Sequence, residues 1–441
     1  MTMPFIIWFY RFLFLPVLLL LLPYHLLRMI RRGGYLKDFS QRLGLGPGLP
    51  KGTKPRVWIQ AVSVGEVLAI ESLVNCLLEK DVEVIVTATT STGYQLALEK
   101  YEGKTSFTGL FPLDFLPGSF LCWHRIKPTL AILMESEVWP EHIHQARKRN
   151  VPVLLVNARM SDHSFRSASK FAWAYGRLLQ GLAGISASGQ QDLKRYVELG
   201  FPMEKTTCSG NLKLDFDLGP EFSKNDKQSL LQQIGFYEPG GEVPMIILGS
   251  STWPEEESFL LDAFQSLIEE GIDCRLLLAP RHMERREEIR RLLARQHLPW
   301  HFRTDDRTKA DSNKIYVADT TGELRQFTQL ATVTFIGKTL PPNKGSQTPI
   351  EAAAFGVPSI FGPETTNFRD ICQQLVEAGA SVRIKNVDGL LPTLREILRN
   401  PQQREQMTLA AKKWHQANLG ATRNTLDFLE PFLQPRKGPD A

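Results

Sequence analysis

The chain has 441 residues, of which 43% are hydrophobic and 22% charged. This composition is that of a globular protein with two or three domains, and it excludes a disordered chain and a disulfide-stabilised miniprotein. The formal net charge of +5 is mildly basic. It suits a protein near anionic lipid or a phosphorylated ligand, and it is too small to predict a nucleic-acid partner. Five scattered cysteines without a CxxC pair are typical of a reducing compartment.

The N-terminal segment is predicted to be an uncleaved membrane anchor. Residues 4–27 are apolar except for Arg11 and His25, and the run is long enough to cross a hydrocarbon layer of ~30 Å. Basic side chains follow this run directly: Arg28, Arg31, Arg32 and Lys37. A cleaved signal peptide would carry its charges before the apolar run, so residues 1–32 are expected to hold the rest of the chain on the cytoplasmic side. A helix lying in the membrane interface and a secretory signal are the alternatives.

Short apolar, β-rich runs alternate with helical patterns in two successive sets. The first set predicts strands at 57–62, 83–88, 130–134, 153–157 and 184–187. The second set predicts strands at 245–248, 275–279, 315–317, 333–336 and 359–361. Helical patterns fall between them, for example at 66–79 and 137–149. This alternation predicts an α/β fold of two doubly wound, Rossmann-like domains, whose ligands bind at the carboxyl ends of the strands.

The domain boundaries follow from a break in this rhythm. A polar stretch contains Gly219-Pro220 and Pro239-Gly240-Gly241, which are typical of a linker. The expected parts are the anchor at 1–32, an N-terminal domain at 33–215, a linker at 216–243, a C-terminal domain at 244–420, and a C-terminal helix and tail at 421–441.

The pattern Ser/Thr-x-x-Glu occurs at four predicted helix starts. The four pairs are Ser63 and Glu66, Thr252 and Glu255, Thr320 and Glu323, and Thr348 and Glu351. Each glutamate could simply cap its helix, because this is the capping-box pattern. Taken together, they indicate several helix N-termini that open toward a cleft between the domains, where free N–H groups would bind phosphate without a metal ion.

Other polar residues follow predicted strands. Glu135 and Glu137 come directly after a very apolar strand, where a carboxylate could also be a surface cap. Lys213 lies near the end of the first domain. Arg281 follows a strand of the second domain, and a surface salt bridge with Glu284 or Glu288 is its alternative role.

Neither a metal site nor a cofactor is predicted. His142 and His144 form an H-x-H pair, but residues two apart on a helix point to different sides. The sequence contains neither the HExxH motif of zinc enzymes nor an EF-hand loop.

Seven segments resemble one family in their order and spacing. They are Ser63-Val64-Gly65-Glu66, Met134-Glu135-Ser136-Glu137-Val138-Trp139-Pro140, Asn157-Ala158-Arg159-Met160-Ser161, Gly210-Asn211-Leu212-Lys213-Leu214-Asp215, Pro280-Arg281-His282, Asp319-Thr320-Thr321-Gly322-Glu323-Leu324, and Gly356-Val357-Pro358 with Gly362-Pro363 and Asn367-Phe368. Together these segments resemble the 3-deoxy-D-manno-octulosonic acid (Kdo) transferases of lipid A assembly.

The resemblance implies a membrane-anchored, metal-independent, inverting glycosyltransferase of the two-domain GT-B fold. Such an enzyme transfers Kdo from CMP-Kdo to the lipid A precursor, lipid IVA, during lipopolysaccharide core synthesis. It would act at the bacterial inner membrane with its catalytic domains on the cytoplasmic side. Residues 33–215 would bind the acceptor, and residues 244–420 would bind the CMP sugar.

The resemblance also implies a role for particular residues. Glu66 would be the general base that takes the proton of the acceptor hydroxyl. Glu135 and Lys213 would stabilise the transition state, in which positive charge builds up on the sugar and negative charge on the departing phosphate. The residues implied for CMP binding are Pro280, Arg281, Thr321, Gly322, Glu323, Thr348, Pro349, Ile350 and Glu351.

The chain departs from the family pattern at two places. Gly345-Ser346-Gln347-Thr348-Pro349 stands where the family usually has Gly-Gly-His-Asn-Pro, and Ser251-Thr252-Trp253 stands where it usually has Ser-Thr-His. Two other functions stay open at this point. One is a GT-B transferase that uses another nucleotide sugar on a lipid or glycan, and the other is a non-catalytic, membrane-tethered glycan-binding protein. The presence of Glu66, Glu135 and Lys213 argues against a loss of catalysis.

Overall fold

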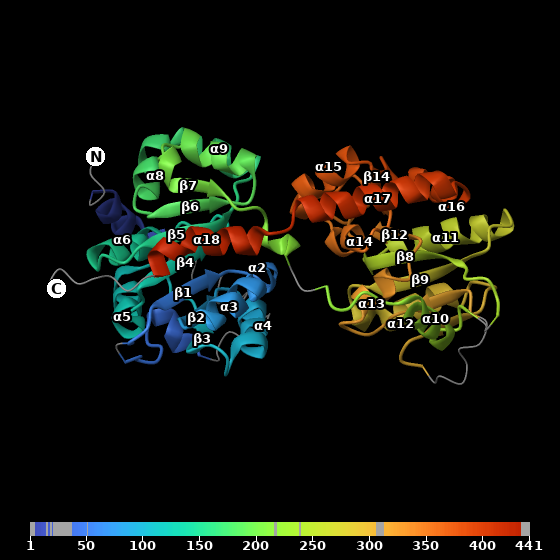
Figure 1. The fold of residues 1–441 in the computed structure, drawn as a ribbon, viewed down its shortest axis with the longest axis horizontal. Helices are drawn as coiled ribbons and strands as arrows, with labels where there is room; N and C mark the ends of the chain where they lie inside the picture. The colour runs from blue at the N-terminus through green and yellow to red at the C-terminus, as the bar shows by residue number, and fades with distance from the viewer. Residues whose placement is uncertain are drawn as a thin grey trace. The chain divides into compact units, whose positions relative to one another are not determined.

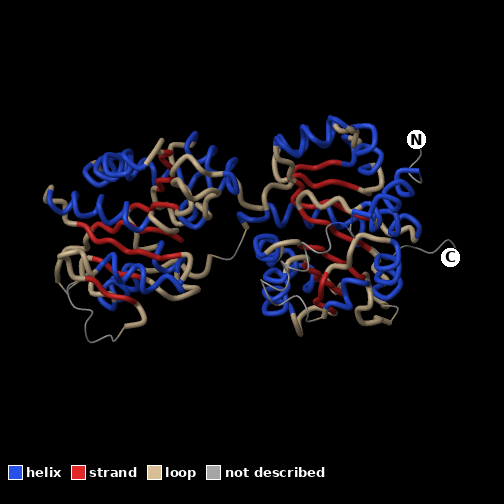
Figure 2. The backbone as a smooth tube through the Cα atoms, turned by 180° about the vertical axis from the view of Figure 1, so that it is seen from behind, coloured by secondary structure: helices blue, strands red, loops and turns tan. Residues whose placement is uncertain are grey.

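The computed structural model describes residues 5–14, 16, 17, 20, 38–50, 52–215, 218–237, 240–305 and 313–433. Two compact units divide the chain (Figure 1): Met1–Asp217 together with Asn418–Ala441 forms the first, and Leu218–Ala417 forms the second. Each unit contains a seven-stranded parallel sheet between helices, which is visible as red strands among blue helices in Figure 2. The prediction of two doubly wound α/β domains is confirmed.

The sheet of the first unit has the order β3-β2-β1-β4-β5-β6-β7. Its strands are β1 (Arg56–Ala61), β2 (Glu83–Ala88), β3 (Phe107–Leu110), β4 (Leu130–Met134), β5 (Val153–Ala158), β6 (Gly184–Ala187) and β7 (Thr206–Cys208). The chain runs outward from β1 to β3 and then continues on the other side of β1 with β4. The junction of β1 and β4 is therefore the switch point at which ligands of such sheets bind.

Helices cover both faces of this sheet. They are α2 (Val64–Ala69), α3 (Glu71–Glu79), α4 (Ser91–Tyr101), α5 (Leu116–Ile126), α6 (Pro140–Lys148), α7 (Asp162–Lys170), α8 (Ala172–Leu179), α9 (Gln190–Glu198) and α18 (Ala421–Leu433). One apolar cluster joins β1, β2 and β4 to α2, α3, α4 and α18, and a second joins the opposite face to α5, α6, α8 and α9. The central strands are buried on both faces, which is why they are continuous apolar runs in the sequence.

The second unit repeats this design with the order β10-β11-β9-β8-β12-β13-β14. Its strands are β8 (Met245–Thr252), β9 (Cys274–Pro280), β10 (Trp300–Phe302), β11 (Ile315–Val317), β12 (Val333–Ile336), β13 (Ser359–Phe361) and β14 (Ser381–Arg383). Its helices are α10 (Lys224–Gln233), α11 (Glu256–Glu269), α12 (Arg286–Leu293), α13 (Leu324–Thr328), α14 (Ile350–Ala354), α15 (Arg369–Glu377), α16 (Leu390–Arg399) and α17 (Pro401–Ala417). Here the switch point lies between β8 and β12.

The stretch predicted as a linker, 216–243, contains helix α10 of the second unit. Ser223 and Asp226 cap this helix reciprocally. Leu230 and Leu231 are buried and join the apolar cluster on one face of the second sheet. The stretch reads as a linker because its few apolar residues occupy one narrow face of an otherwise polar helix.

The C-terminal helix belongs to the first unit, although the sequence predicts only a helix and tail beyond residue 420. Leu429 is fully buried in the core of the first unit. The carboxylate of Asp215 accepts hydrogen bonds from the backbone N–H groups of Gly420 (2.8 Å) and Thr422 (2.6 Å). Asp215, near the end of the N-terminal part of the first unit, therefore holds the start of α18 against that unit.

Residues 5–14 form a helix that packs on the first unit. Ile7 is buried, and the Tyr10 hydroxyl donates to the Asp114 carboxylate at 2.7 Å. The Arg11 guanidinium forms two hydrogen bonds of 2.8 Å with the Glu141 carboxylate, whose side chain has no exposed surface. Arg11 therefore has an acidic partner within the protein.

No helix among the described residues is both long and apolar enough to cross a membrane. Much of the predicted anchor, including residues 21–32, lies outside the described residues.

Replacing Arg11 with methionine is expected to destabilise the first unit by about 3–5 kcal/mol, because it leaves Glu141 buried without its cation. Thermal unfolding at neutral pH would measure this loss. A second substitution, Glu141→Gln, should restore most of the stability by removing the uncompensated charge. A single variant that unfolds at the wild-type temperature would contradict the importance of the pair.

Candidate active site

Four ionisable side chains gather at the carboxyl edge of the first sheet, and we call them the carboxylate cluster: Glu66, Glu135, Glu137 and Lys213. Glu66 lies in the first turn of α2, directly after β1. Glu135 follows β4, the strand beside β1, so both residues lie at the switch point. Lys213 is delivered by the short 3-10 helix Leu212–Leu214 beyond β7. The structure thus brings together the three residues for which the sequence predicts catalytic roles.

Glu66 is a buried carboxylate held by two local hydrogen bonds. Its side chain accepts a bond from the Val62 backbone N–H at 2.8 Å and another from the Ser63 hydroxyl at 3.0 Å. Burial and the nearby charge of Glu135 raise the pKa of Glu66, although these two hydrogen bonds and Lys213 act in the opposite direction. A carboxylate with a raised pKa is a stronger base once it is ionised.

Glu135 and Lys213 form an ion pair, with 2.5 Å between the carboxylate Oε1 and the ammonium Nζ. The backbone of Glu135 has a φ of 54°, a left-handed conformation that costs free energy for a residue with a side chain. The Glu135 backbone N–H donates to the Val156 carbonyl at 3.0 Å, which ties this conformation to strand β5. The strained turn aims the carboxylate into the cluster and not along the strand.

Asn157 and Asn211 fix the position of Lys213. The Asn157 side-chain oxygen accepts a bond from the Leu212 backbone N–H at 3.1 Å. The Asn211 side-chain oxygen accepts one from the Lys213 backbone N–H at 3.0 Å. Asn157 itself has a left-handed φ of 51° at the end of β5. These amides are the physical reason for the Asn-Ala-Arg and Gly-Asn-Leu-Lys segments of the sequence.

Glu137 is part of the cluster, although the sequence assigned it no role. Burial together with the charges of Glu66 and Glu135 raises the pKa of Glu137 to about 7. The sequence signal was present, since Glu135 and Glu137 both follow the same apolar strand, but spacing alone does not show that the turn keeps both carboxylates on one side.

Replacing Glu137 with glutamine is expected to stabilise the protein at pH 8 by about 1–3 kcal/mol and to have little effect near pH 4.5. The pKa of Glu137 is higher in the folded protein than its ordinary value of 4.5, so its ionisation opposes folding. The protein therefore loses this share of stability as the pH rises from about 4.5 to about 7. Unfolding temperatures at both pH values would measure the effect, with Glu198→Gln on the exposed side of α9 as the control. A pH-independent difference would contradict it.

In the second unit, a pocket of about 190 Å³ lies at the ends of β8, β9 and β11. Five of the residues predicted to bind CMP line it: Pro280, Arg281, Thr321, Gly322 and Glu323. The alternative salt bridges of Arg281 are taken by other residues, since Glu284 pairs with His282 and Glu288 pairs with Arg285. Arg281 thus places an exposed guanidinium at a pocket large enough for part of a nucleotide.

Glu323 lines this pocket and is held by two neighbouring side chains. Its carboxylate forms an ion pair with the Arg303 guanidinium at 2.8 Å and accepts a hydrogen bond from the Thr320 hydroxyl. Asp319, at the start of the same loop, pairs with Arg286 at 2.6 Å. These contacts give Glu323 a positioning role and leave the backbone of Thr321 and Gly322 at the pocket surface.

The remaining residues predicted for CMP binding lie at the start of α14 and are not among those that line this pocket: Thr348, Pro349, Ile350 and Glu351. The Thr348 hydroxyl accepts a hydrogen bond from the Ile350 backbone N–H at 3.2 Å. Burial raises the pKa of Glu351. Thr348 therefore bonds the first backbone N–H of α14, although Pro349 is the N-cap residue, and its contact with a nucleotide stays a prediction.

None of the four predicted Ser/Thr and Glu pairs forms a capping box, in which the two side chains bond each other's backbone N–H groups. Helices α2, α13 and α14 each have six residues or fewer, so they sum few peptide dipoles and offer little charge to a phosphate. The pair Thr252 and Glu255 does not cap α11. The buried carboxylate here is that of Glu256, the next residue. It accepts hydrogen bonds from the backbone N–H groups of Trp253, Lys338, Thr339 and Leu340. Glu256 thereby joins the ends of β8 and β12 at the switch point.

Trp253, at one of the departures from the family pattern, contacts one charged group and one other ring. The Lys338 ammonium lies 4.3 Å from the centre of the Trp253 ring, and the centre of the His282 ring lies 4.8 Å from it in a T-shaped arrangement. At the other departure, the backbone N–H groups of Ser346 and Gln347 donate to the Lys338 and Gly337 carbonyls at 2.9 Å. The Ser346 hydroxyl donates to the Gln347 carbonyl at 2.6 Å, so the loop after β12 is held by backbone bonds and by a side chain in which it departs.

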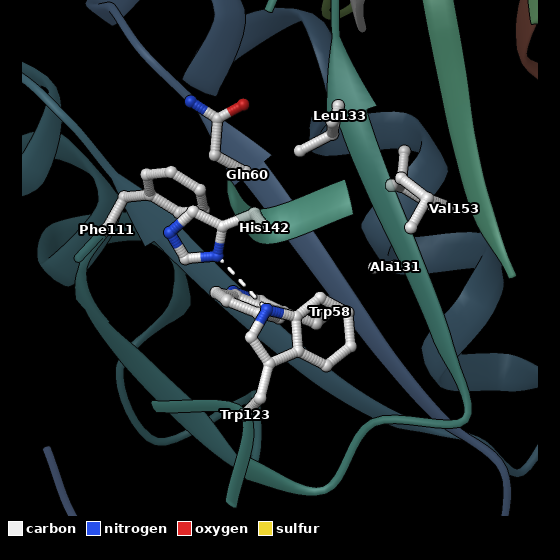
Figure 3. Close-up of a pocket in the computed structure, with 9 residues that line it drawn as sticks. Trp58, Gln60, Phe111, Trp123, Ala131, Leu133, His142 and Val153 are labelled. Carbon is white, nitrogen blue, oxygen red and sulfur yellow. Dashed lines mark hydrogen bonds between the residues drawn. The ribbon is translucent and has the colours of Figure 1, made fainter. Parts of the chain in front are cut away.

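The H-x-H pair contains a core histidine. Figure 3 shows His142 among Trp58, Phe111 and Trp123, around a cavity of about 10 Å³. Its Nδ1 accepts a hydrogen bond from the Trp123 indole N–H at 3.1 Å, and burial lowers its pKa to about 3. A neutral imidazole of this kind contributes to packing.

Clusters of three or more potential metal-ligating side chains are absent from the described ranges. Asp215 and Asp217 have a D-x-D spacing that could supply oxygen ligands to a divalent cation. The Asp215 carboxylate is instead bonded to the backbone at the start of α18, and Asp217 lies outside the described residues.

The chain is similar in sequence to proteins of one enzyme family. The family model for 3-deoxy-D-manno-octulosonic-acid transferase (kdotransferase) matches residues 37–216. A 3-deoxy-D-manno-octulosonic acid transferase from Bordetella pertussis is 33% identical over 425 residues, covering 92% of this chain and 94% of its own. The enzyme of the same name from Haemophilus influenzae is 29% identical over 438 residues, covering 96% and 99%.

A solved structure shares the fold at low identity. The UDP-GlcNAc 2-epimerase from Neisseria meningitidis, bound to UDP-GlcNAc, covers 85% of this chain and all of its own with a TM-score of 0.58 and 14% identity. This likeness shows that the two parallel-sheet units form a GT-B fold, and it carries no statement about substrate.

Proposed function

Because the chain belongs to the 3-deoxy-D-manno-octulosonic acid transferase family and is a glycosyltransferase that transfers Kdo, we propose that its donor is CMP-Kdo and its acceptor the lipid A precursor, lipid IVA. The observation that carries the proposal is the carboxylate cluster, in which Glu66 has a raised pKa beside the ion pair of Glu135 and Lys213. A base and a charge pair are what glycosyl transfer to a hydroxyl requires.

In the proposed reaction, the acceptor hydroxyl oxygen forms a bond to the anomeric carbon of Kdo. The bond between that carbon and the phosphate oxygen breaks, and its electron pair leaves with CMP. The proton of the hydroxyl passes to Glu66. Attack opposite to the leaving group inverts the anomeric configuration.

The charges of the transition state are matched by residues already described. Glu135 offers a carboxylate to the positive charge that develops on the sugar. Lys213 offers an ammonium to the negative charge that develops on the leaving group, and Arg281 binds the nucleotide phosphate in the second unit. The backbone at Thr321 and Gly322 and the start of α14 complete the proposed nucleotide site.

The direct test is incubation with CMP-Kdo and lipid IVA, read by mass spectrometry. We expect a product heavier than the acceptor by one or more Kdo residues, together with CMP. Transfer from another nucleotide sugar in place of CMP-Kdo, or binding of the acceptor without transfer, would contradict the proposal.

Transfer is expected to persist in excess EDTA, because Arg281 and Lys213 supply the positive charge that the leaving phosphate needs. Product formation would be followed with and without the chelator. A loss of activity that Mg²⁺ or Mn²⁺ restores would contradict the metal-independent mechanism.

We also propose that residues 1–32 attach the enzyme to the cytoplasmic face of the bacterial inner membrane. Apolar side chains on the described part of this segment support the proposal, since Trp8, Phe9 and Phe12 are exposed. The basic residues at 28–37 would face anionic lipid. If the enzyme partitions into the soluble fraction with this segment intact, the proposal fails.

A further inference from the structure

The first unit contains a second pocket, which has a volume of about 540 Å³ and which we call the α7–α8 pocket. Its exposed lining is mainly apolar and comes from Ile6, Met160, Ala168, Phe171, Ala174 and Leu178. Helix α7 adds the polar side chains of His163, Ser164 and Ser167. Pockets that bind small ligands have volumes of roughly 300–1,000 Å³ and a mainly apolar lining. The size and lining are therefore those of a ligand site and not of a packing defect.

The α7–α8 pocket adjoins the carboxylate cluster. Ser136 lines the pocket and is the residue between Glu135 and Glu137. Tyr175 also lines it, and Glu137 is close enough for its charge to contribute, after burial, to raising the Tyr175 pKa to about 12. The pocket thus has one end at the proposed catalytic carboxylates.

The other structural feature of the pocket is an apolar, exposed rim. The Phe171 side chain, which lines the pocket, is 63% exposed, and Trp173 in α8, two residues later, is 58% exposed. Large apolar side chains that gather at the surface usually mark a site for a partner or a lipid.

We propose that the α7–α8 pocket binds an acyl chain of the glycolipid acceptor while the acceptor hydroxyl reaches the carboxylate cluster. The inference rests on the proposed function, because it takes the acceptor to be a glycolipid. A glycolipid is polar at the reacting hydroxyl and apolar a few bonds away. The pocket combines the same two characters, since Ser136 lies between Glu135 and Glu137 in the chain and Ile6, Phe171 and Leu178 supply apolar surface. The acceptor would then be recognised by its chain as well as by its sugar.

The test measures the binding of n-alkyl glucosides with hexyl, octyl, decyl and dodecyl chains, each below its micelle concentration, by calorimetry on the full-length protein. Burying a methylene strengthens binding by about fourfold, so affinity should rise steeply with chain length. The same glucosides should inhibit Kdo transfer competitively with the glycolipid acceptor, in the same order of chain length.

Two substitutions and a matched control locate the site. Ala174→Phe fills the pocket from α8 and should abolish the dependence of affinity on chain length. Gln180→Phe adds the same ring at an exposed position at the end of the same helix and should leave the dependence unchanged. Phe171→Asp places a charge at an exposed side chain of the pocket, so it gives the answer even if Ala174→Phe fails to fold.

The possible outcomes separate the two proposals. A chain-length dependence that survives both Ala174→Phe and Phe171→Asp would overturn the pocket as the site. Binding that follows the variants but does not compete with the acceptor would overturn the acceptor chain as its occupant. Failure of the wild-type protein to transfer Kdo would overturn the proposed function and with it the acceptor chain as occupant, while the glucoside series would still report whether the pocket binds alkyl chains.

Discussion

Replacing Glu66 with glutamine is expected to slow Kdo transfer by roughly a hundredfold or more, the loss that follows removal of a general base. The shape of the side chain is kept. Its amide oxygen can accept the bond from the Val62 N–H, and its amide nitrogen can donate to the Ser63 hydroxyl, so both local contacts of Glu66 survive. The amide cannot take a proton at neutral pH. Initial rates at saturating CMP-Kdo would measure the effect.

Two controls separate chemistry from stability. Loss of a helix-cap contact costs only about 0.5–2 kcal/mol, so the glutamine variant should unfold within a few degrees of the wild type and should still bind CMP. Ser63→Ala removes one contact of Glu66 but keeps the carboxylate, and it should retain most of the activity. If Glu66→Gln transfers Kdo at a rate near that of the wild type, Glu66 is a structural residue and Glu135 becomes the candidate base.

The wild-type pH profile offers an independent check. Burial and Glu135 raise the pKa of Glu66, so the base should become protonated, and the rate should fall, at a pH above the ordinary pKa of 4.5. Glu137 titrates nearby, with its pKa raised to about 7. The acid side of the profile therefore reports the cluster as a whole, and the Glu137→Gln variant should shift it to lower pH by removing a neighbouring negative charge.

The sequence predicted the central strands and missed the edges. Strands β1, β4 and β5 are buried on both faces, so their residues are apolar without a break. The missed strands are the two end strands of each sheet, β3, β7, β10 and β14, which are short and carry partly exposed residues. The equally short strands β6, β11, β12 and β13 could be predicted because they are buried throughout and therefore apolar.

In the site, too, the residues that depend on contacts distant in sequence could not be predicted. The strand ends could be predicted, and with them Glu66, Glu135 and Arg281, whereas Lys213 follows β7, a strand that was missed. The choice between Glu255 and Glu256 could not, because it depends on the backbone N–H groups that follow β12, more than 80 residues away. The place of Glu137 in the carboxylate cluster likewise depends on the turn at Glu135. No sequence pattern predicts the left-handed φ of that residue.

Replacing Lys213 with methionine is expected to lower kcat/KM by about a hundredfold to a thousandfold, the usual effect of removing a preorganised charge from a transition state. The 2.5 Å ion pair with Glu135 gives the lysine a second effect that can be measured separately. Lys213 is a positive charge that lowers the pKa of Glu66. Its loss should raise that pKa further, so the acid side of the pH profile should move to higher pH.

That shift distinguishes catalysis from structural support, because a merely destabilised variant would lose activity without moving its pH profile. Lys213→Arg keeps the charge and should leave the acid side of the profile close to that of the wild type, even if the larger group slows transfer. In a double-mutant cycle with Glu135→Gln, the two losses should be strongly non-additive, because the residues act as one pair. Additive losses together with an unmoved pH profile would show that the ion pair is not part of the catalytic machinery, and the base at Glu66 would then act in a field set by Glu135 and Glu137 alone.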